Sequence, residues 1–141
     1  MQKTVLPLML SLAMSCSSLL MMARASAQTG QQETQQRFPD VIGVKVRPAA
    51  GGGRQFDFDV TISSPYDTPD RYADGFRVKG KDGTVYGVRK LWHDHAGEQP
   101  FTRDLYGVDI PSGVSSVTVE ARDQQHGWGG ETLDVILPKK R

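Results

Sequence analysis

The stretch Gln55-Phe56-Asp57-Phe58-Asp59-Val60-Thr61-Ile62 decides the fold class. Its even-numbered positions are aromatic or β-branched, and polar residues alternate with them. Successive side chains of an extended strand point to opposite faces, so one face of this segment is apolar and the other polar. The pattern is typical of a strand that lays one face on a hydrophobic core.

Short runs of the same kind recur on both sides of this strand, separated by Gly, Pro, Ser and Asp. The expected strands are 41–46, 55–62, 74–79, 84–92, 101–110, 114–122 and 131–137. Between the third and fourth, Asp82-Gly83 marks a tight hairpin. About seven evenly spaced strands in roughly 100 residues, with no amphipathic helix, predict an all-β sandwich of the immunoglobulin-like or fibronectin type III-like kind.

Residues 1–27 have the pattern of a cleaved signal peptide. Lys3 precedes an apolar run over 5–22, and Ala25-Ser26-Ala27 forms a small-x-small cleavage site. The run is short for a membrane-spanning helix. A lipoprotein signal ending at Cys16 is less well matched, because Ala13 occupies the position where leucine is usual. We therefore expect an exported protein, periplasmic or secreted, with no integral membrane span after cleavage.

Removal of residues 1–27 changes what the remaining chain can do. The single cysteine and all five methionines lie in this segment, so the mature chain has no disulfide and no sulfur ligand. Loss of Lys3 and Arg24 lowers the basic residues from 17 to 15, against 16 acidic residues. Such a near-neutral balance argues against nucleic acid as a partner.

Three further segments complete the expected organisation. Residues 28–37 are Gln-rich and lack an apolar side chain, which predicts a flexible leader. Residues 38–138 form the β-sandwich domain, and 139–141 form a short basic tail that we expect to be solvated.

Several peptide strings carry a resemblance to known proteins. They are 73–78 (ADGFRV), 93–95 (HDH) leading into 98–103 (EQPFTR), and 121–123 (ARD) before 126–132 (HGWGGET). These strings resemble a family of small uncharacterised exported bacterial proteins with a fibronectin type III or immunoglobulin-like β-sandwich. The resemblance implies export and the domain boundaries, and it carries over no catalytic residue.

Most of the side chains that could form a binding site lie in loops that the expected topology brings to one end of the sandwich. These loops are 63–73, 93–100 and 123–130, and the opposite end receives turns of Gly, Lys and Ser with little chemistry. All three histidines and both tryptophans belong to the first group, in the loops or at their edges. We therefore expect any binding site to lie at this end.

The histidines permit two interpretations. His93 and His95 point the same way in an extended segment, about 7 Å apart, and His126 from the neighbouring loop would complete a three-nitrogen site. Such a site suits zinc or copper, with Asp94 or Glu98 as a further ligand or as an orienting group. The more common role of loop histidines is to pin the loop, for example through a bond from His95 to Glu98.

The tryptophans and the remaining residues favour binding over catalysis. Trp92 and Trp128 either cover the core or, if exposed together, form a platform for a glycan or a protein. The sequence has no Gly-x-Ser-x-Gly elbow, and a small sandwich rarely offers the cleft that a pair of catalytic carboxylates needs. We therefore expect a non-catalytic binding module whose partner is a protein, a glycan or a metal ion, with a zinc- or copper-binding periplasmic protein as the alternative.

Overall fold

The computed structural model describes residues 36–139, and within this range every regular element is a strand. The strands are β1 (Asp40–Pro48), β2 (Gln55–Ser63), β3 (Ala73–Lys79), β4 (Val85–Lys90), β5 (Phe101–Asp109), β6 (Ser116–Asp123), β7 (Gly127–Trp128) and β8 (Leu133–Ile136). The all-β prediction is confirmed. The predicted signal peptide, most of the leader and the last two residues of the basic tail lie outside the described residues.

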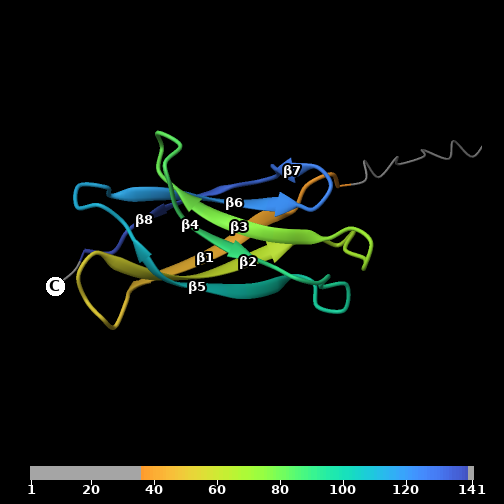
Figure 1. Ribbon diagram of the computed structural model, residues 1–141, viewed down its shortest axis with the longest axis horizontal. Helices are drawn as coiled ribbons and strands as arrows, with labels where there is room; N and C mark the ends of the chain where they lie inside the picture. Colours follow the sequence, from red (N-terminus) through yellow and green to blue (C-terminus); the bar gives the residue numbers. More distant parts are fainter. Residues whose placement is uncertain (1–35, 140–141) are drawn as a thin grey trace, which may run out of the picture. The chain divides into compact units, whose positions relative to one another are not determined.

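The strands form two antiparallel sheets, stacked as a sandwich (Figure 1). One sheet has the order β1-β2-β5, and the other has the order β4-β3-β6-β7, with β8 also paired to β6. Chain neighbours therefore cross between the sheets at β2–β3, β4–β5 and β5–β6. The two-layer sandwich is as predicted, and kinship to the immunoglobulin or fibronectin type III domains stays a prediction.

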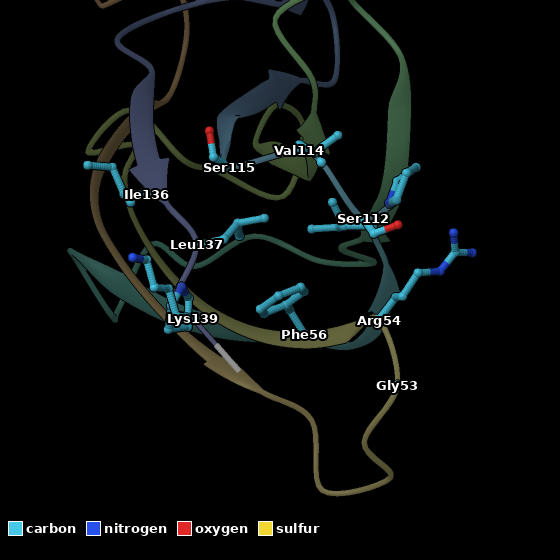
Figure 2. Close-up of a pocket in the computed structure, with 13 residues that line it drawn as sticks. Gly53, Arg54, Phe56, Ser112, Val114, Ser115, Ile136, Leu137 and Lys139 are labelled. Carbon is cyan, nitrogen blue, oxygen red and sulfur yellow. The ribbon is translucent and has the colours of Figure 1, made fainter. Parts of the chain in front are cut away.

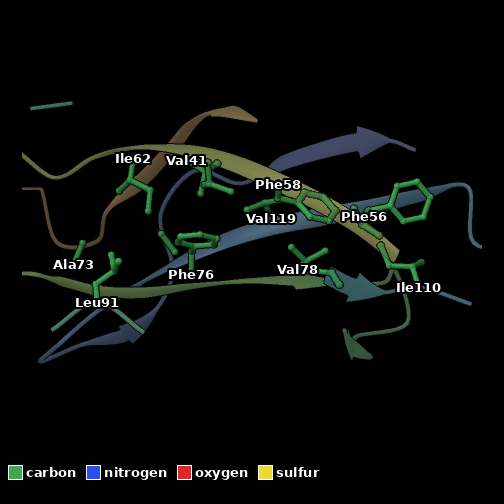
Figure 3. Close-up of a cluster of buried hydrophobic side chains, with 14 of the residues drawn as sticks. Val41, Phe56, Phe58, Ile62, Ala73, Phe76, Val78, Leu91, Ile110 and Val119 are labelled. Atoms are coloured by element: carbon green, nitrogen blue, oxygen red, sulfur yellow. The ribbon is translucent and has the colours of Figure 1, made fainter. Parts of the chain in front are cut away.

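The core lies between the two sheets and contains the predicted apolar faces (Figure 3). Phe58, Val60 and Ile62 of β2 are completely buried, as are Phe76 of β3 and Val119 of β6. The alternation in β2 follows the period of two that its sequence shows. One buried face per sheet is what the hydrophobic effect requires of a two-layer domain.

The last strand differs from the prediction of one run over 131–137. Two short strands, β7 and β8, pair with β6 instead, and residues 130–132 interrupt this pairing between them. Gly130 has a φ of +87°, and a Cβ atom there would lie 2.1 Å from the carbonyl oxygen of Pro39. The break therefore occurs where the chain passes so close to the segment before β1 that only glycine fits.

Candidate functional site

Three loops lie together at one end of the sandwich, as the sequence predicted. They are residues 64–72, 91–100 and 124–126, which emerge at the right of Figure 1. We call this surface the loop end. Residues 49–54, 80–84 and 110–115 turn the chain at the opposite end.

His93 and His95 are neighbours, but their surroundings differ. Their ring centroids are 5.0 Å apart. His95 is buried and stacks on the ring of Phe101, with 3.8 Å between centroids and 11° between planes. His93 is exposed, and its Nδ1 atom lies 2.8 Å from the carbonyl oxygen of Asp94. The structure therefore brings these two predicted residues together, with one of them inside the fold.

His126 has other neighbours. Its ring and the Phe38 ring form a T-shaped pair with 6.1 Å between centroids, and its backbone N–H donates to Asp123. Across residues 36–139, no three side chains of His, Cys, Asp or Glu are grouped as a metal ion requires. The loop end thus holds all three histidines without gathering them, and the zinc or copper site stays a prediction that this geometry does not support.

The remaining predicted residues near the histidines serve the loop itself. Asp94 accepts a hydrogen bond from the backbone N–H of Ala96 at 3.1 Å. Glu98 forms a two-pronged ion pair with Arg103, at 2.8 and 3.2 Å, and not with His95 as the sequence suggested. The hydrogen bonds from Arg103 keep the pKa of Glu98 below its usual value. Asp94 and Glu98 therefore stabilise the loop 91–100, and neither of their carboxylates bonds to His95, whose backbone N–H has another acceptor.

Asp67 is that acceptor, and it joins two of the loops. Its carboxylate is fully buried and accepts hydrogen bonds from the backbone N–H groups of Ala73 and His95, both at 3.0 Å. Gln99 adds a second link, since Ser64 N–H donates to its side-chain oxygen at 2.8 Å. The loop that carries Trp92 is therefore fastened to the loop 64–72 through buried polar groups, which are costly to leave unpaired.

Asp123 plays the same part for the third loop. One carboxylate oxygen accepts hydrogen bonds from the backbone N–H groups of Gln125 and His126, and the other accepts from Arg71 Nε at 3.1 Å. Arg71 also lies over the ring of Tyr66. Burial raises the pKa of the Tyr66 hydroxyl, and the nearby Asp123 carboxylate raises it further, so this phenol stays protonated. The cluster fixes the loop 124–126 against the loop 64–72.

The two tryptophans are presented differently. Trp92 is 79% exposed, with Lys90 Nζ 5.5 Å from its ring centroid. Tyr72 OH donates to its carbonyl oxygen at 3.3 Å. Trp128 is half-buried beneath the guanidinium of Arg77, 4.1 Å from its ring centroid. The sequence allowed either residue to be exposed, and the structure exposes Trp92.

The sequence placed Asp67 at this end of the domain but gave no sign of its role. An aspartate in a Pro-rich loop is usually a solvated turn residue. Its burial depends on the register between loops that are 28 residues apart in the chain. Asp123, the buried carboxylate that holds the third loop, ends a clear strand and is followed by a polar loop, which is a signal for an acid that caps backbone N–H groups.

The environment of His95 predicts that the stability of the folded domain depends on pH. Burial lowers the pKa of His95, and the positive charge of Arg103 lowers it further, so the folded ring stays neutral. Its Nδ1 atom lies 3.8 Å from Asp67 Oδ2, which is too far for a hydrogen bond. Below its ordinary value of 6.5, the unfolded chain binds a proton that the folded protein does not, so stability falls as the pH drops from 6.5 towards the folded pKa.

We expect the His95→Phe variant to fold and to lose this part of the pH dependence. Phenylalanine keeps the stack on Phe101 and carries no titrating group. Urea unfolding of both proteins between about pH 7 and about pH 5 measures the effect, since protonation differences set the slope of stability against pH. Equal slopes of unfolding free energy against pH for the two proteins would show that His95 binds protons as readily in the folded state as in the unfolded state, contrary to the prediction.

Comparison with known proteins gives one informative relative. A protein of Halomicrobium mukohataei named "Putative lipoprotein" is 35% identical over 113 residues, which are 80% of this chain and 54% of that protein. This chain therefore spans about half the length of that curated relative. No protein-family model matches the chain, and no solved structure matches it. In the described part of the chain, no helix has the length and apolarity that a membrane crossing needs.

Proposed function

We propose that this chain is an exported, non-catalytic binding module that recognises a protein or glycan through its loop end. The observation that carries the proposal is Trp92, which is 79% exposed on a loop held by buried hydrogen bonds. A large aromatic side chain left in water on a well-ordered loop is a common mark of a contact surface.

The surroundings of Trp92 support a prearranged contact. Asp67 fixes the backbone of His95, and Gln99 donates to the His95 carbonyl oxygen at 3.1 Å. A loop that is already ordered loses little conformational entropy on binding, so more of the contact energy appears as affinity. Lys90 Nζ lies 5.5 Å from the centroid of the indole ring and supplies a positive charge beside it.

The polar groups of the loop end argue for binding over catalysis. Asp67 and Asp123 are buried and use their carboxylate oxygens to hold backbone groups. Ser64 and His95 are buried as well. A general base or nucleophile must reach a substrate, and these four side chains are engaged in, or enclosed by, the fold.

Export is supported from two directions. The first 27 residues have the pattern of a cleaved signal peptide, and the name of the Halomicrobium relative describes a lipoprotein. We propose cleavage after Ala27, which leaves Gln28 as the first residue. Intact-mass measurement of the exported protein tests this directly, because a lipid-bearing chain that begins at Cys16 would be heavier by the extra residues and the lipid.

The Trp92→Ala variant tests the binding proposal. Isolated cell envelopes of the source organism serve as the probe, and bound protein is measured after sedimentation. We expect affinity to fall at least about tenfold, as is usual when a central aromatic contact is truncated. Treatment of the envelopes with protease distinguishes a protein ligand, whose binding is lost, from a glycan ligand, whose binding persists.

Tyr106→Ala is the matched control. Tyr106 is also an exposed aromatic residue, at 62%, but it lies on β5 beside Arg47 and outside the loop end. This variant is expected to bind the envelopes like the unmodified protein. Equal retention of the Trp92→Ala variant, or loss of retention in both variants, would contradict the proposal.

A further inference from the structure

An apolar pocket opens at the end of the sandwich opposite the loop end. It has a volume of about 370 Å³ and lies where the loop before β2, the turn between β5 and β6 and the segment after β8 meet (Figure 2). The buried side chains of Phe56, Ile110 and Leu137 line it. The sequence predicted turns with little chemistry here, because it did not show that Phe56 of β2, Ile110 after β5 and Leu137 after β8 meet at this end.

One wall of the pocket is unusually exposed. Ile136 is 82% exposed, the highest fraction among the large apolar side chains of residues 36–139. Its strand, β8, pairs with the start of β6 and places this side chain at the rim. Apolar surface that remains in water at the mouth of a concave site favours an apolar ligand, since binding removes that surface from water.

The charges around the pocket have one sign. Arg54 and Lys139 line it, and the described lining includes no Asp or Glu. In Figure 2 the two cationic residues lie on either side of Phe56. Arg54 also donates to Asp109 at 3.0 Å, but both side chains of this pair are more than half exposed, so the pair is weak. An anionic group at the rim would therefore meet the positive charge of Lys139 and that of Arg54, which its exposed pair with Asp109 neutralises only in part.

From this combination we infer that the pocket binds a free medium-chain alkyl carboxylate. The alkyl chain lies against Phe56, Ile110 and Leu137, and the carboxylate lies at the rim beside Lys139 or Arg54. The volume is near the lower limit of ligand sites, which favours a single short chain over a two-chain lipid. This site is separate from the loop end and does not depend on the function proposed for it.

Calorimetric titration with octanoate, 1-octanol and octylammonium tests the inference. These probes share one alkyl chain and differ in charge. Octanoate is expected to bind most tightly and octylammonium most weakly. Across hexanoate, octanoate and decanoate, affinity is expected to rise by about two- to fourfold per methylene, the range for partial to full burial of that group. Backbone amide resonances of residues 112–115 and of Ile136, Leu137 and Lys139 are expected to shift on binding.

Two isoleucine variants form a matched pair. Ile136→Glu puts an anion at the rim and is expected to weaken octanoate binding at least tenfold. Ile42→Glu changes another exposed isoleucine, on β1 and outside the pocket lining, and is expected to bind octanoate unchanged. Because both side chains are exposed, both variants are expected to fold.

A third variant tests the role of the charge. Lys139→Gln is expected to weaken octanoate binding and leave octanol binding unchanged. The inference is overturned if octylammonium or octanol binds as tightly as octanoate, or if octanoate does not bind at millimolar concentration. It is also overturned if Ile136→Glu keeps its affinity for octanoate, or if octanoate shifts only amide resonances of residues outside the pocket.

Discussion

Replacing Asp67 by alanine is expected to lower the free energy of unfolding by about 2–6 kcal/mol, since each of two buried donors left unpaired costs about 1–3 kcal/mol. These donors are the backbone N–H groups of Ala73 and His95, each 3.0 Å from a carboxylate oxygen. A small domain is stable by only about 5–15 kcal/mol, so the loss is a large part of the total.

Urea unfolding at neutral pH measures this loss, and Asp70→Ala is its control. Asp70 belongs to the same loop and undergoes the same substitution, but it is exposed. Its replacement is expected to change stability by no more than about 0.5 kcal/mol. If Asp67→Ala is as stable as Asp70→Ala, the buried carboxylate does not hold the two loops together.

Asp123→Ala is expected to cost about 3–5 kcal/mol, the range found when one partner of a buried ion pair is removed. Its carboxylate is fully buried, whereas Arg71 keeps 17% of its side chain exposed. The variant also leaves the N–H groups of Gln125 and His126 without their acceptor. The same urea measurement applies, and a loss below about 1 kcal/mol, as for an exposed pair, would contradict this account.

Asp123→Asn separates the charge from the hydrogen bonds. Burial alone raises the pKa of Asp123, but the hydrogen bonds from His126 and Gln125 and the charge of Arg71 outweigh it and hold the pKa below 3.8. The resulting stabilisation is complete above that value and is lost as the pH falls through the folded pKa. The stability difference between the unmodified protein and the asparagine variant should therefore shrink on acidification. A difference that stays constant with pH would contradict the stabilising role of the Asp123 charge.

Much of the fold followed from local pattern. In β2, alternation of apolar and polar residues specified both the strand and its buried face, because the period of two is a property of the extended chain. The hairpin at Asp82-Gly83 was equally local, and Gly83 has a φ of +88°. The division of the last strand into β7 and β8 was not predictable, because it depends on how closely Pro39 approaches Gly130.

The loop end was predictable as a location but not as a set of contacts. Strand order brings its three loops together, so the sequence could place the histidines and tryptophans at one end. Which histidine is buried depends on the stack of His95 on Phe101 and on the bond from its backbone to Asp67. Contacts between segments so distant in the chain leave no mark on the spacing of residue types along the sequence.

Collisional quenching of tryptophan fluorescence tests the central claim, that the loop end presents Trp92 to solvent as a contact surface. The Trp128→Phe variant leaves Trp92 as the single tryptophan of the chain. Acrylamide and iodide should quench its emission nearly as well as that of free indole, with the emission maximum at the long wavelength of a solvated ring. A shielded, blue-shifted Trp92 in the folded protein would contradict the account.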